Sequence, residues 1–310
     1  MSTMRIITNL DQINLSKGTV VTIGTFDGVH AGHRKIITEV VHLARVENLI
    51  STILTFEPHP RTVINKTGSD SMKLLTTFQE KTDILRDIGI DQLIVIPFTP
   101  EFAEMGYEDF IKSILVDTLR ANWIVVGYNH TFGKNRQGNF QTLQQFSKMY
   151  PFRLLEIGPY QHEGQTISSS QIRNLLLAGS VEKASMMLGY PYMMIGQVVR
   201  GDGRGRKLTF PTANIDLTDG RKLIPANGVY AVDCTVHSKN YRGMTNIGFK
   251  PTFGAHAQTI EVHLFDFSDM IYGEQIKVSF LKRLREEIKF SSETELIKQL
   301  QQDKINSLHV

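Results

Sequence analysis

The stretch "VVTIGTFDGVHAGH", residues 20–33, places a glycine-rich turn between an apolar run and a helical pattern. The run before the turn is continuously apolar, as a buried strand is. After the turn, Ile37, Val41 and Ala44 fall on one face of a helix. A strand, a tight turn and a helix in this order predict one βα unit of a parallel sheet.

Four further apolar runs repeat the pattern of the first, and helical patterns near residues 79–89 and 110–115 separate some of them. Short continuous strands alternating with helices predict an α/β fold, a doubly wound parallel sheet covered on both faces. Ligands of such sheets bind at the carboxyl ends of the strands, which is where the glycine-rich turn lies. The four runs are residues 50–56, 91–98, 122–128 and 152–158.

The pattern changes near residue 190 to short apolar runs separated by Gly, Pro, Asn and Asp. This spacing predicts a small antiparallel β-barrel or a sandwich. In the tail, Ser292 and Glu295 have the spacing of a capping box and predict a C-terminal helix. We therefore expect two domains, residues 1–186 and 187–310. The apolar runs are residues 193–199, 228–236, 244–249, 259–267 and 275–281.

Composition narrows the class of protein. The chain of 310 residues has one cysteine, Cys234, which cannot form an internal disulfide, so we expect an intracellular, cytoplasmic protein. The start of the chain does not resemble a signal peptide, and no apolar run approaches the ~20 residues of a membrane span. A net charge of +3 is too weak to indicate nucleic acid. We expect neither a membrane nor a nucleic-acid partner.

The turn also carries groups that suit phosphate. Gly24 and Gly28 let the backbone bend sharply, and the helix that follows offers unpaired N–H groups. His30 and His33, three residues apart, can face one site and donate to phosphate oxygens. The alternative is a plain βα turn, capped by Asp27, with two incidental histidines. We expect no zinc, because the HExxH pattern and a nearby third ligand are both absent.

A second glycine-rich stretch, "GDGRGRKLTFPTANI", spans residues 201–215. Its flexibility and its cations fit a phosphate cradle, although a plain basic hairpin loop would look the same. Arg206 stands where the dinucleotide pattern GxGxxG needs its third glycine, so we expect no NAD. The cradle residues would be Gly203, Gly205, Arg206 and Lys207.

The first half resembles a known family. "GTFDGVHAGH" contains the HxGH signature of the nucleotidyltransferase superfamily, in the longer form typical of prokaryotic FAD synthetases. "ISSSQIR" is similar to the superfamily's ISSTxIR signature, with Ser170 where Thr is usual. Three more stretches agree with this resemblance: "TFEPHPR" (55–61), "LLTTFQEKTDIL" (74–85) and "VVGYNHTFGKNRQG" (125–138).

This resemblance implies roles for individual residues. His30 and His33 would be catalytic, contacting the ATP phosphates and stabilising charge on the α-phosphoryl group. Asn129 would help to place the substrate or a metal, and "EPHP" would form a flavin-side wall or only a stiffened loop. The implied ATP-binding residues are Gly24, Phe26, Asp27, Asn129, Ser169, Ser170 and Arg173.

The second half resembles the riboflavin kinase module, above all in "PTAN", residues 211–214. Thr212 and Asn214 would bind Mg²⁺ and ATP phosphate, and Glu261 would be the catalytic base. Arg285 and Glu287 match a pattern near the flavin pocket. Taken alone, Glu261 could be an outward-facing strand residue. The other matching stretches are "GRGRKLTFPTANI", "PANGVYAV", "NIGFKPTFG", "IEVHLFDF" and "LREEIKF".

Together the two resemblances imply a bifunctional riboflavin kinase and FAD synthetase. One module would convert riboflavin and ATP to FMN and ADP, and the other would convert FMN and ATP to FAD and pyrophosphate, with Mg²⁺. The expected partners are riboflavin, FMN and ATP, and a homo-oligomer stays open. The alternatives are an enzyme with one inactive module, a flavin-sensing binding protein, and nucleotidyl transfer to another acceptor.

Overall fold

The computed structural model describes residues 4–64, 72–162, 164–201, 210–249 and 258–310. The chain divides into two compact units, Met1–Ser168 and Ser169–Val310. Each unit is described by itself.

Unit 1 is built on a six-stranded sheet in the order β1-β4-β3-β2-β5-β6, and every neighbouring pair is parallel. The five expected strands are all present, and the prediction of a parallel sheet is confirmed. Only the three-residue edge strand β1 was not expected. The strands are β1 (Arg5–Ile7), β2 (Thr19–Ile23), β3 (Ile50–Glu57), β4 (Gln92–Pro97), β5 (Ala121–Gly127) and β6 (Arg153–Ile157).

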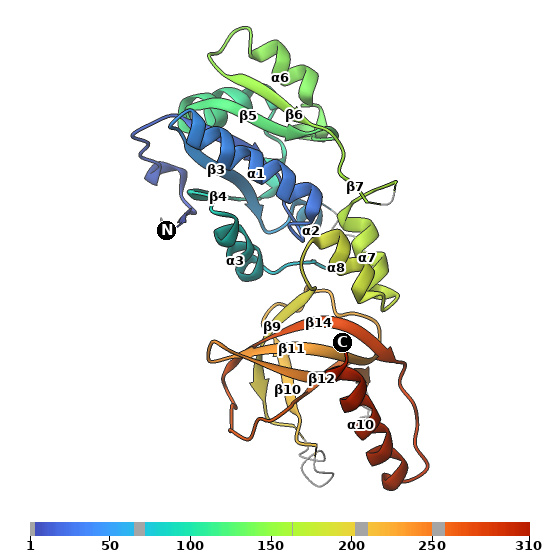
Figure 1. Ribbon diagram of the computed structural model, residues 1–310. Helices are drawn as coiled ribbons and strands as arrows, with labels where there is room; N and C mark the ends of the chain where they lie inside the picture. Colours follow the sequence, from blue (N-terminus) through green and yellow to red (C-terminus); the bar gives the residue numbers. More distant parts are fainter. Residues whose placement is uncertain (1–3, 65–71, 163, 202–209, 250–257) are drawn as a thin grey trace. The chain divides into compact units, whose positions relative to one another are not determined.

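Helices cover both faces of this sheet, since Val20 and Val21 point to opposite faces and are both fully buried. Helix α1 (Ala31–Val46) packs across β2, β3 and β5 (Figure 1). The π-helix η2 (Phe110–Thr118) contributes four buried residues to a core that includes Ile23. The remaining elements are η1 (Leu10–Gln12), α2 (Pro60–Ile64), α3 (Phe78–Ile88), α4 (Pro100–Ala103), α5 (Tyr107–Asp109), η3 (Lys134–Arg136), α6 (Phe140–Phe146) and the hairpin of β7 (Gln161–His162) and β8 (Gln165–Thr166).

The strand order locates the ligand edge of this unit. From β2 the chain proceeds outward through β3 to β4, whereas β5 and β6 lie on the other side of β2. A parallel sheet opens a crevice where the strand order reverses, at the carboxyl ends of the two strands concerned. The turn that begins at Gly24 follows β2, and the loop that contains Asn129 follows β5.

Unit 2 contains a closed six-stranded barrel in the order β10-β13-β12-β11-β14-β9, with antiparallel neighbours. Of the two expected architectures, the barrel is confirmed. The five predicted runs all form strands, and β10 is the addition. The strands are β9 (Met193–Val199), β10 (Ala213–Leu217), β11 (Gly228–Val236), β12 (Lys239–Phe249), β13 (Gln258–Leu264) and β14 (Gln275–Arg285).

The expected C-terminal helix is α10 (Glu293–Leu308), which packs against β11, β12 and β14 (Figure 1). The Ser292 hydroxyl accepts the Glu295 amide at 3.3 Å, as expected of an N-cap. The Glu295 carboxylate, however, accepts from the amide and hydroxyl of Ser291. One bond of the predicted capping box is therefore present. In the other, the Glu295 carboxylate binds Ser291 in place of the Ser292 amide.

Two helices precede the barrel within unit 2, α7 (Ser169–Leu177) and α8 (Val181–Leu188). The Ala226 amide donates to the Leu176 carbonyl at 3.0 Å, and the Tyr192 amide donates to the Ser185 hydroxyl at 3.1 Å. These bonds join both helices to the chain of the barrel. The division at residue 168 therefore lies one helix pair before the expected boundary at 186. No helix in the described ranges is long and apolar enough to span a membrane.

Candidate active sites

The turn between β2 and α1 is held in an unusual backbone conformation. Phe26 and Val29 have φ angles of 47° and 34°, in the left-handed region that residues with a side chain rarely adopt. Gly28 shares this region, with φ of 82°, and meets no such steric cost. Backbone strain of this kind persists only where the surroundings enforce it, and it is common at functional sites.

Asp27 supplies much of that enforcement. Its buried carboxylate accepts the backbone amides of Leu75 and Thr76 at 3.0 and 3.1 Å, and the Thr76 hydroxyl accepts the Gly28 amide at 3.0 Å. Asp27 does not cap α1, because the N-cap residue is His30. The carboxylate instead joins the turn to the segment that leads into α3.

His30 and His33 lie together as the sequence predicted, with their rings stacked 3.6 Å apart and 16° from parallel. The His33 amide donates to Nδ1 of His30 at 3.3 Å, so the proton of a neutral His30 ring is on Nε2. Nδ1 of His33 is buried and has no hydrogen-bond partner among the described residues. A Cβ on Gly32 would lie 3.3 Å from the His30 ring, a tight contact that a glycine between the histidines avoids.

Both imidazoles are neutral near pH 7. Burial lowers the pKa of His30 to about 4, against the attraction of Asp27. Burial, then the neighbouring His30, then Lys81 hold the pKa of His33 well below its usual value. The two rings therefore enter the site as hydrogen-bond donors and not as cations.

Lys81 is the nearby cation, and the sequence analysis did not single it out. It is almost fully buried on α3, and its ammonium donates to the Thr25 carbonyl at 3.0 Å, within the same turn. Lys81 lies in "LLTTFQEKTDIL", a stretch that resembles the FAD synthetases, and this resemblance was the only sequence signal for it. The helical spacing of the apolar residues in the stretch indicates only packing. Lysine is seldom buried in proteins, so the burial of Lys81 beside the histidines indicates a role in this site.

Asn129 is exposed in the loop after β5. The next residue, His130, packs its ring on Phe132, with centroids 5.8 Å apart. Burial lowers the pKa of His130 to about 4, and its Nε2 has no hydrogen-bond partner in the described part of the chain. This loop and the histidine turn lie at the carboxyl ends of the neighbouring strands β5 and β2.

Of the segment "SSSQIR", residues 169–173 belong to unit 2, where they open helix α7, and Ser168 is the last residue of unit 1. Ser169 is the first helical residue, Ser170 is exposed beside it, and Arg173 follows four residues after Ser169, on the same helical face. Two hydroxyls and a guanidinium at a helix start can bind an anion.

In the barrel, Thr212 and Glu261 meet although 49 residues separate them in the chain. The Thr212 hydroxyl donates to the Glu261 carboxylate at 3.2 Å. Asn214 lies opposite Glu261 in the pairing of β10 with β13. The Asn214 side chain fills the space beside Gly201, where a Cβ would collide with it. The structure thus brings together three of the residues that the sequence assigned to the kinase site.

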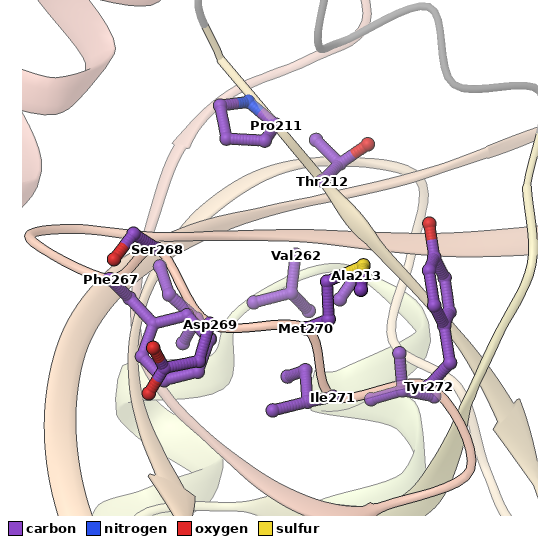
Figure 2. Close-up of a pocket in the computed structure, with 12 residues that line it drawn as sticks. Pro211, Thr212, Ala213, Val262, Phe267, Ser268, Asp269, Met270, Ile271 and Tyr272 are labelled. Carbon is purple, nitrogen blue, oxygen red and sulfur yellow. The ribbon is translucent and has the colours of Figure 1, made fainter.

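A pocket opens beside Thr212 (Figure 2). Pro211 and Thr212 form one side, and the segment from Phe267 to Tyr272 runs around the other. Most of the lining side chains are apolar and a few are polar, as in small-molecule sites. The lining residues are Val198, Pro211, Thr212, Ala213, Val262, Leu264, Phe267, Ser268, Asp269, Met270, Ile271 and Tyr272.

The two residues expected near a flavin have different surroundings. The Glu287 carboxylate accepts from the Asn227 amide at 3.2 Å and lies against Gly248. The Arg285 guanidinium makes a two-pronged ion pair with Asp303 of α10, at 2.8 to 3.1 Å, and the Asp303 side chain is 1% exposed. The expected cradle residues Gly203, Gly205, Arg206 and Lys207 lie outside the described residues.

Comparisons with known proteins assign a different family to each half of the chain. The family model for FAD synthetase matches residues 12–171, and the model for riboflavin kinase matches residues 188–310. A bifunctional riboflavin kinase/FMN adenylyltransferase of Buchnera aphidicola is 38% identical over 98% of this chain and 96% of its own length. Proteins of the same name from Bacillus subtilis and Escherichia coli K12 are 36% and 35% identical, over 92% and 99% of this chain and 90% and 97% of their own lengths.

Among solved structures, a protein of Streptococcus pneumoniae titled a macrolide-efflux protein aligns with a TM-score of 0.91 and 31% identity, over 99% of both chains. We take only a similarity of fold from it. The two family models and the curated relatives together cover nearly the whole sequence. The chain belongs to the family of bifunctional riboflavin kinases/FMN adenylyltransferases, transferases that make FMN from riboflavin and FAD from FMN.

Proposed function

We propose that the kinase reaction takes place at the Thr212–Glu261 pair and adenylyl transfer at the His30–His33 pair. The observation that carries this proposal is that each pair is assembled within its own unit, with a carboxylate in one and stacked neutral imidazoles in the other. A carboxylate suits removal of a proton from a hydroxyl. Imidazole N–H groups suit a phosphoryl group that gains charge.

In the kinase reaction, Glu261 accepts the proton of the ribityl 5′-hydroxyl of riboflavin. The hydroxyl oxygen then bonds to the γ-phosphorus of ATP, and the bond between that phosphorus and the bridging oxygen of ADP breaks. The products are FMN and ADP. The Thr212 hydroxyl, which donates to Glu261 at 3.2 Å, orients the carboxylate in the free enzyme.

The pocket beside Thr212 supports a position for the adenine of ATP. Val198, Val262 and Ile271 line the pocket and offer apolar contact to a flat base, and the phosphates would extend toward Thr212. Asn214 and Glu261 continue this polar side along β10 and β13.

The donors near Thr212 fit Mg²⁺. The hydroxyl of Thr212, the amide oxygen of Asn214 and the Glu261 carboxylate are hard oxygen ligands, which Mg²⁺ prefers, usually beside substrate phosphates. No three acidic, histidine or cysteine side chains gather as a metal cage in the described ranges, so Thr212 and Asn214 would act together with ATP itself. When bound, Mg²⁺ neutralises charge on the phosphates.

In adenylyl transfer, an oxygen of the FMN phosphate attacks the α-phosphorus of ATP, and pyrophosphate leaves. His30, through Nε2–H, and His33 would donate to oxygens of the reacting phosphates, and Lys81 would add positive charge from the adjoining helix. Ser169, Ser170 and Arg173 have the donors needed to hold phosphate as well, and Asn129 would contact the substrate or a metal.

For the flavin of the kinase site we propose Glu287 as the contact residue and Arg285 as its support. The Arg285 guanidinium already binds Asp303 through two nitrogens, whereas the Glu287 carboxylate is exposed beside Asn227. Cytoplasmic location, the absence of nucleic-acid and membrane partners, and the oligomeric state stay predictions from the sequence.

The test is incubation of the chain with riboflavin, ATP and Mg²⁺, followed by separation of the flavins. We expect FMN to form first and FAD to follow, with ADP and pyrophosphate as co-products. FMN alone, or FAD only from added FMN, would indicate one inactive module. Riboflavin binding without turnover would support the flavin-sensing alternative.

The expected domain boundary can be tested on the same assay. Fragment 187–310 should convert riboflavin to FMN if the barrel and α10 suffice, and fragment 169–310, which keeps α7 and α8, is the matched control. A folded fragment 169–310 without kinase activity would overturn the assignment of that reaction to unit 2. Activity in the longer fragment only would overturn the boundary at residue 187.

A further inference from the structure

The short segment Phe210–Thr212 carries the Thr212 hydroxyl, yet it precedes strand β10 and has no ladder partner of its own in the described pairings. A hydroxyl that must meet both a carboxylate and a nucleotide needs a fixed backbone. The contacts that fix this segment therefore contribute to the kinase reaction by placing the Thr212 hydroxyl.

One contact is a hydrogen bond from the neighbouring strand. Nδ1 of His263 lies 2.7 Å from the Pro211 carbonyl oxygen. Because a carbonyl can only accept, this nitrogen must carry the proton. Glu261 and His263 are two apart on β13, so both side chains leave the same face of the strand. Glu261 therefore binds Thr212 and His263 binds Pro211, so the two side chains of β13 hold two successive residues.

Aromatic packing fixes the orientation of the His263 ring. The ring meets Phe210 edge-on at 5.1 Å and Phe265 at 5.5 Å, and only 8% of His263 is exposed. Phe210 and Phe265 belong to a small core that also contains Met244, with Leu300 of α10 packed against it. The C-terminal helix thus braces the ring that holds the Pro211 carbonyl.

We propose that His263 is a positioning residue of the kinase reaction: its Nδ1–H holds the Pro211 carbonyl so that Thr212 meets Glu261 and the ATP phosphates. Burial lowers the pKa of His263 more than its bond to Pro211 raises it, so the ring is neutral at pH 7. Its single N–H is then used in this bond. The inference rests on the proposed kinase roles of Thr212 and Glu261.

Three variants separate the hydrogen bond from the packing. His263→Phe keeps a ring against Phe210 and removes the donor. His263→Asn loses the ring but keeps an N–H two bonds from Cβ, where Nδ1 stands, whereas His263→Gln moves that N–H one bond farther. The matched control is His309→Phe, since Nδ1 of His309 also contacts a backbone carbonyl, that of Ile305 at 2.8 Å, at the end of α10.

We expect kcat/KM for ATP in FMN formation to fall by roughly 3- to 10-fold in His263→Phe and His263→Gln, the range of one neutral hydrogen bond. His263→Asn should keep most of the activity, and His309→Phe should keep all of it. Riboflavin binding, followed by quenching of its fluorescence, and FAD formation from added FMN should not change. The Asn and Gln variants compare donors of equal chemistry, so they decide the matter even where the Phe variant folds poorly.

A double-mutant cycle with Thr212→Ala tests whether His263 acts through Thr212. The effect of His263→Phe on kcat/KM for ATP should vanish in the Thr212→Ala background. An equal effect in both backgrounds, or equal losses in the Asn and Gln variants, would overturn the proposal. If Thr212→Ala itself left the kinase reaction unchanged, the assigned role of Thr212 would fail, and the inference with it. Additive losses would refute the inference alone.

Discussion

The two candidate sites hold their chemical groups by different means. In unit 1, the turn of residues 24–33 carries both histidines, and one hydrogen bond joins His33 to His30 directly. In unit 2, Thr212 lies just before β10 and Glu261 lies on β13, 49 residues later, and the two meet only when β10 pairs with β13. Local backbone geometry thus forms the first site, whereas the pairing register of the barrel strands forms the second.

This difference predicts where each site is vulnerable. The histidine turn depends on buried polar contacts, above all the Asp27 carboxylate on the amides of Leu75 and Thr76. The kinase site depends on contacts remote from it, such as the α10 residues that support Phe210 and Arg285. Each prediction below tests one side of the comparison.

The largest effect is expected for Glu261→Gln, which keeps the shape of the side chain and removes the base. FMN formation should fall by ~10²–10⁴-fold, the usual contribution of general-base catalysis. FAD formation from added FMN should be nearly unchanged, because Glu261 is not among the residues assigned to adenylyl transfer. The control is Glu286→Gln, an exposed carboxylate close to Arg285 in sequence. Parallel loss of both activities in the Glu261 variant would point to misfolding and remove support for the base.

Next is the double variant His30→Ala with His33→Ala. Removal of one preorganised donor costs ~10²–10³-fold, and two donors on one group need not add, so we expect at least that loss in FAD formation. FMN formation should continue. His42→Ala, an exposed histidine on the same helix α1, is the matched control. FAD synthesis at wild-type rate in a folded double variant would move the adenylylation site elsewhere.

A third prediction concerns Asp303→Ala, which removes the carboxylate that pairs with Arg285, a side chain only 15% exposed in the structure. Breaking a buried ion pair by removing one partner is strongly destabilising, so unfolding of unit 2 should lose about 3 kcal/mol. Asp233→Ala breaks the more exposed pair with Arg242 in the same unit and should change stability much less. Urea unfolding monitored by kinase activity measures both. Equal stabilities would mean that α10 does not support the barrel through this pair.

The smallest expected effect concerns acid stability. The pKa of His130 is lowered from 6.5 to about 4, so the unfolded chain binds a proton there that the folded chain refuses. Folding is then favoured above pH 6.5, and stability falls as the pH drops toward 4. His130→Phe keeps a ring on Phe132 and should remove up to about 1.4 kcal/mol per pH unit of this slope. Urea unfolding between pH 4.5 and pH 7.5 measures how the free energy of unfolding depends on pH. An unchanged slope in His130→Phe would show that the pKa of His130 is not lowered by folding.

The sequence predicted most of the architecture because its signals are local. Continuous apolar runs mark the strands of a buried parallel sheet, and β9 and β11 have the predicted limits. Strand β10 was missed because Asn214 and Asp216 interrupt its apolar pattern. The choice between barrel and sandwich could not be made, since closure depends on β9 pairing with both β10 and β14.

The sites were predictable to the extent that their residues lie in short motifs. The histidine stack follows from a three-residue spacing, whereas the surroundings of Lys81 depend on α3 packing beside the turn. The partner of Arg285 lies 18 residues later on α10, and no local pattern links them. Sequence motifs thus indicate which side chains bear the chemistry, but packing decides which of them are already engaged.

The bonds from α7 and α8 to the barrel have a practical consequence for protein engineering. A chimera joined between α8 and β9 would take the Ser185 hydroxyl from one parent and its Tyr192 amide donor from the other, and it would place Gly179 of one parent against the Arg283 side chain of the other. A junction before Ser169 transfers both pairs from the same parent. Exchange of modules between relatives should therefore succeed more often at the earlier junction, even though residues 169–173 of "SSSQIR" then travel with the barrel.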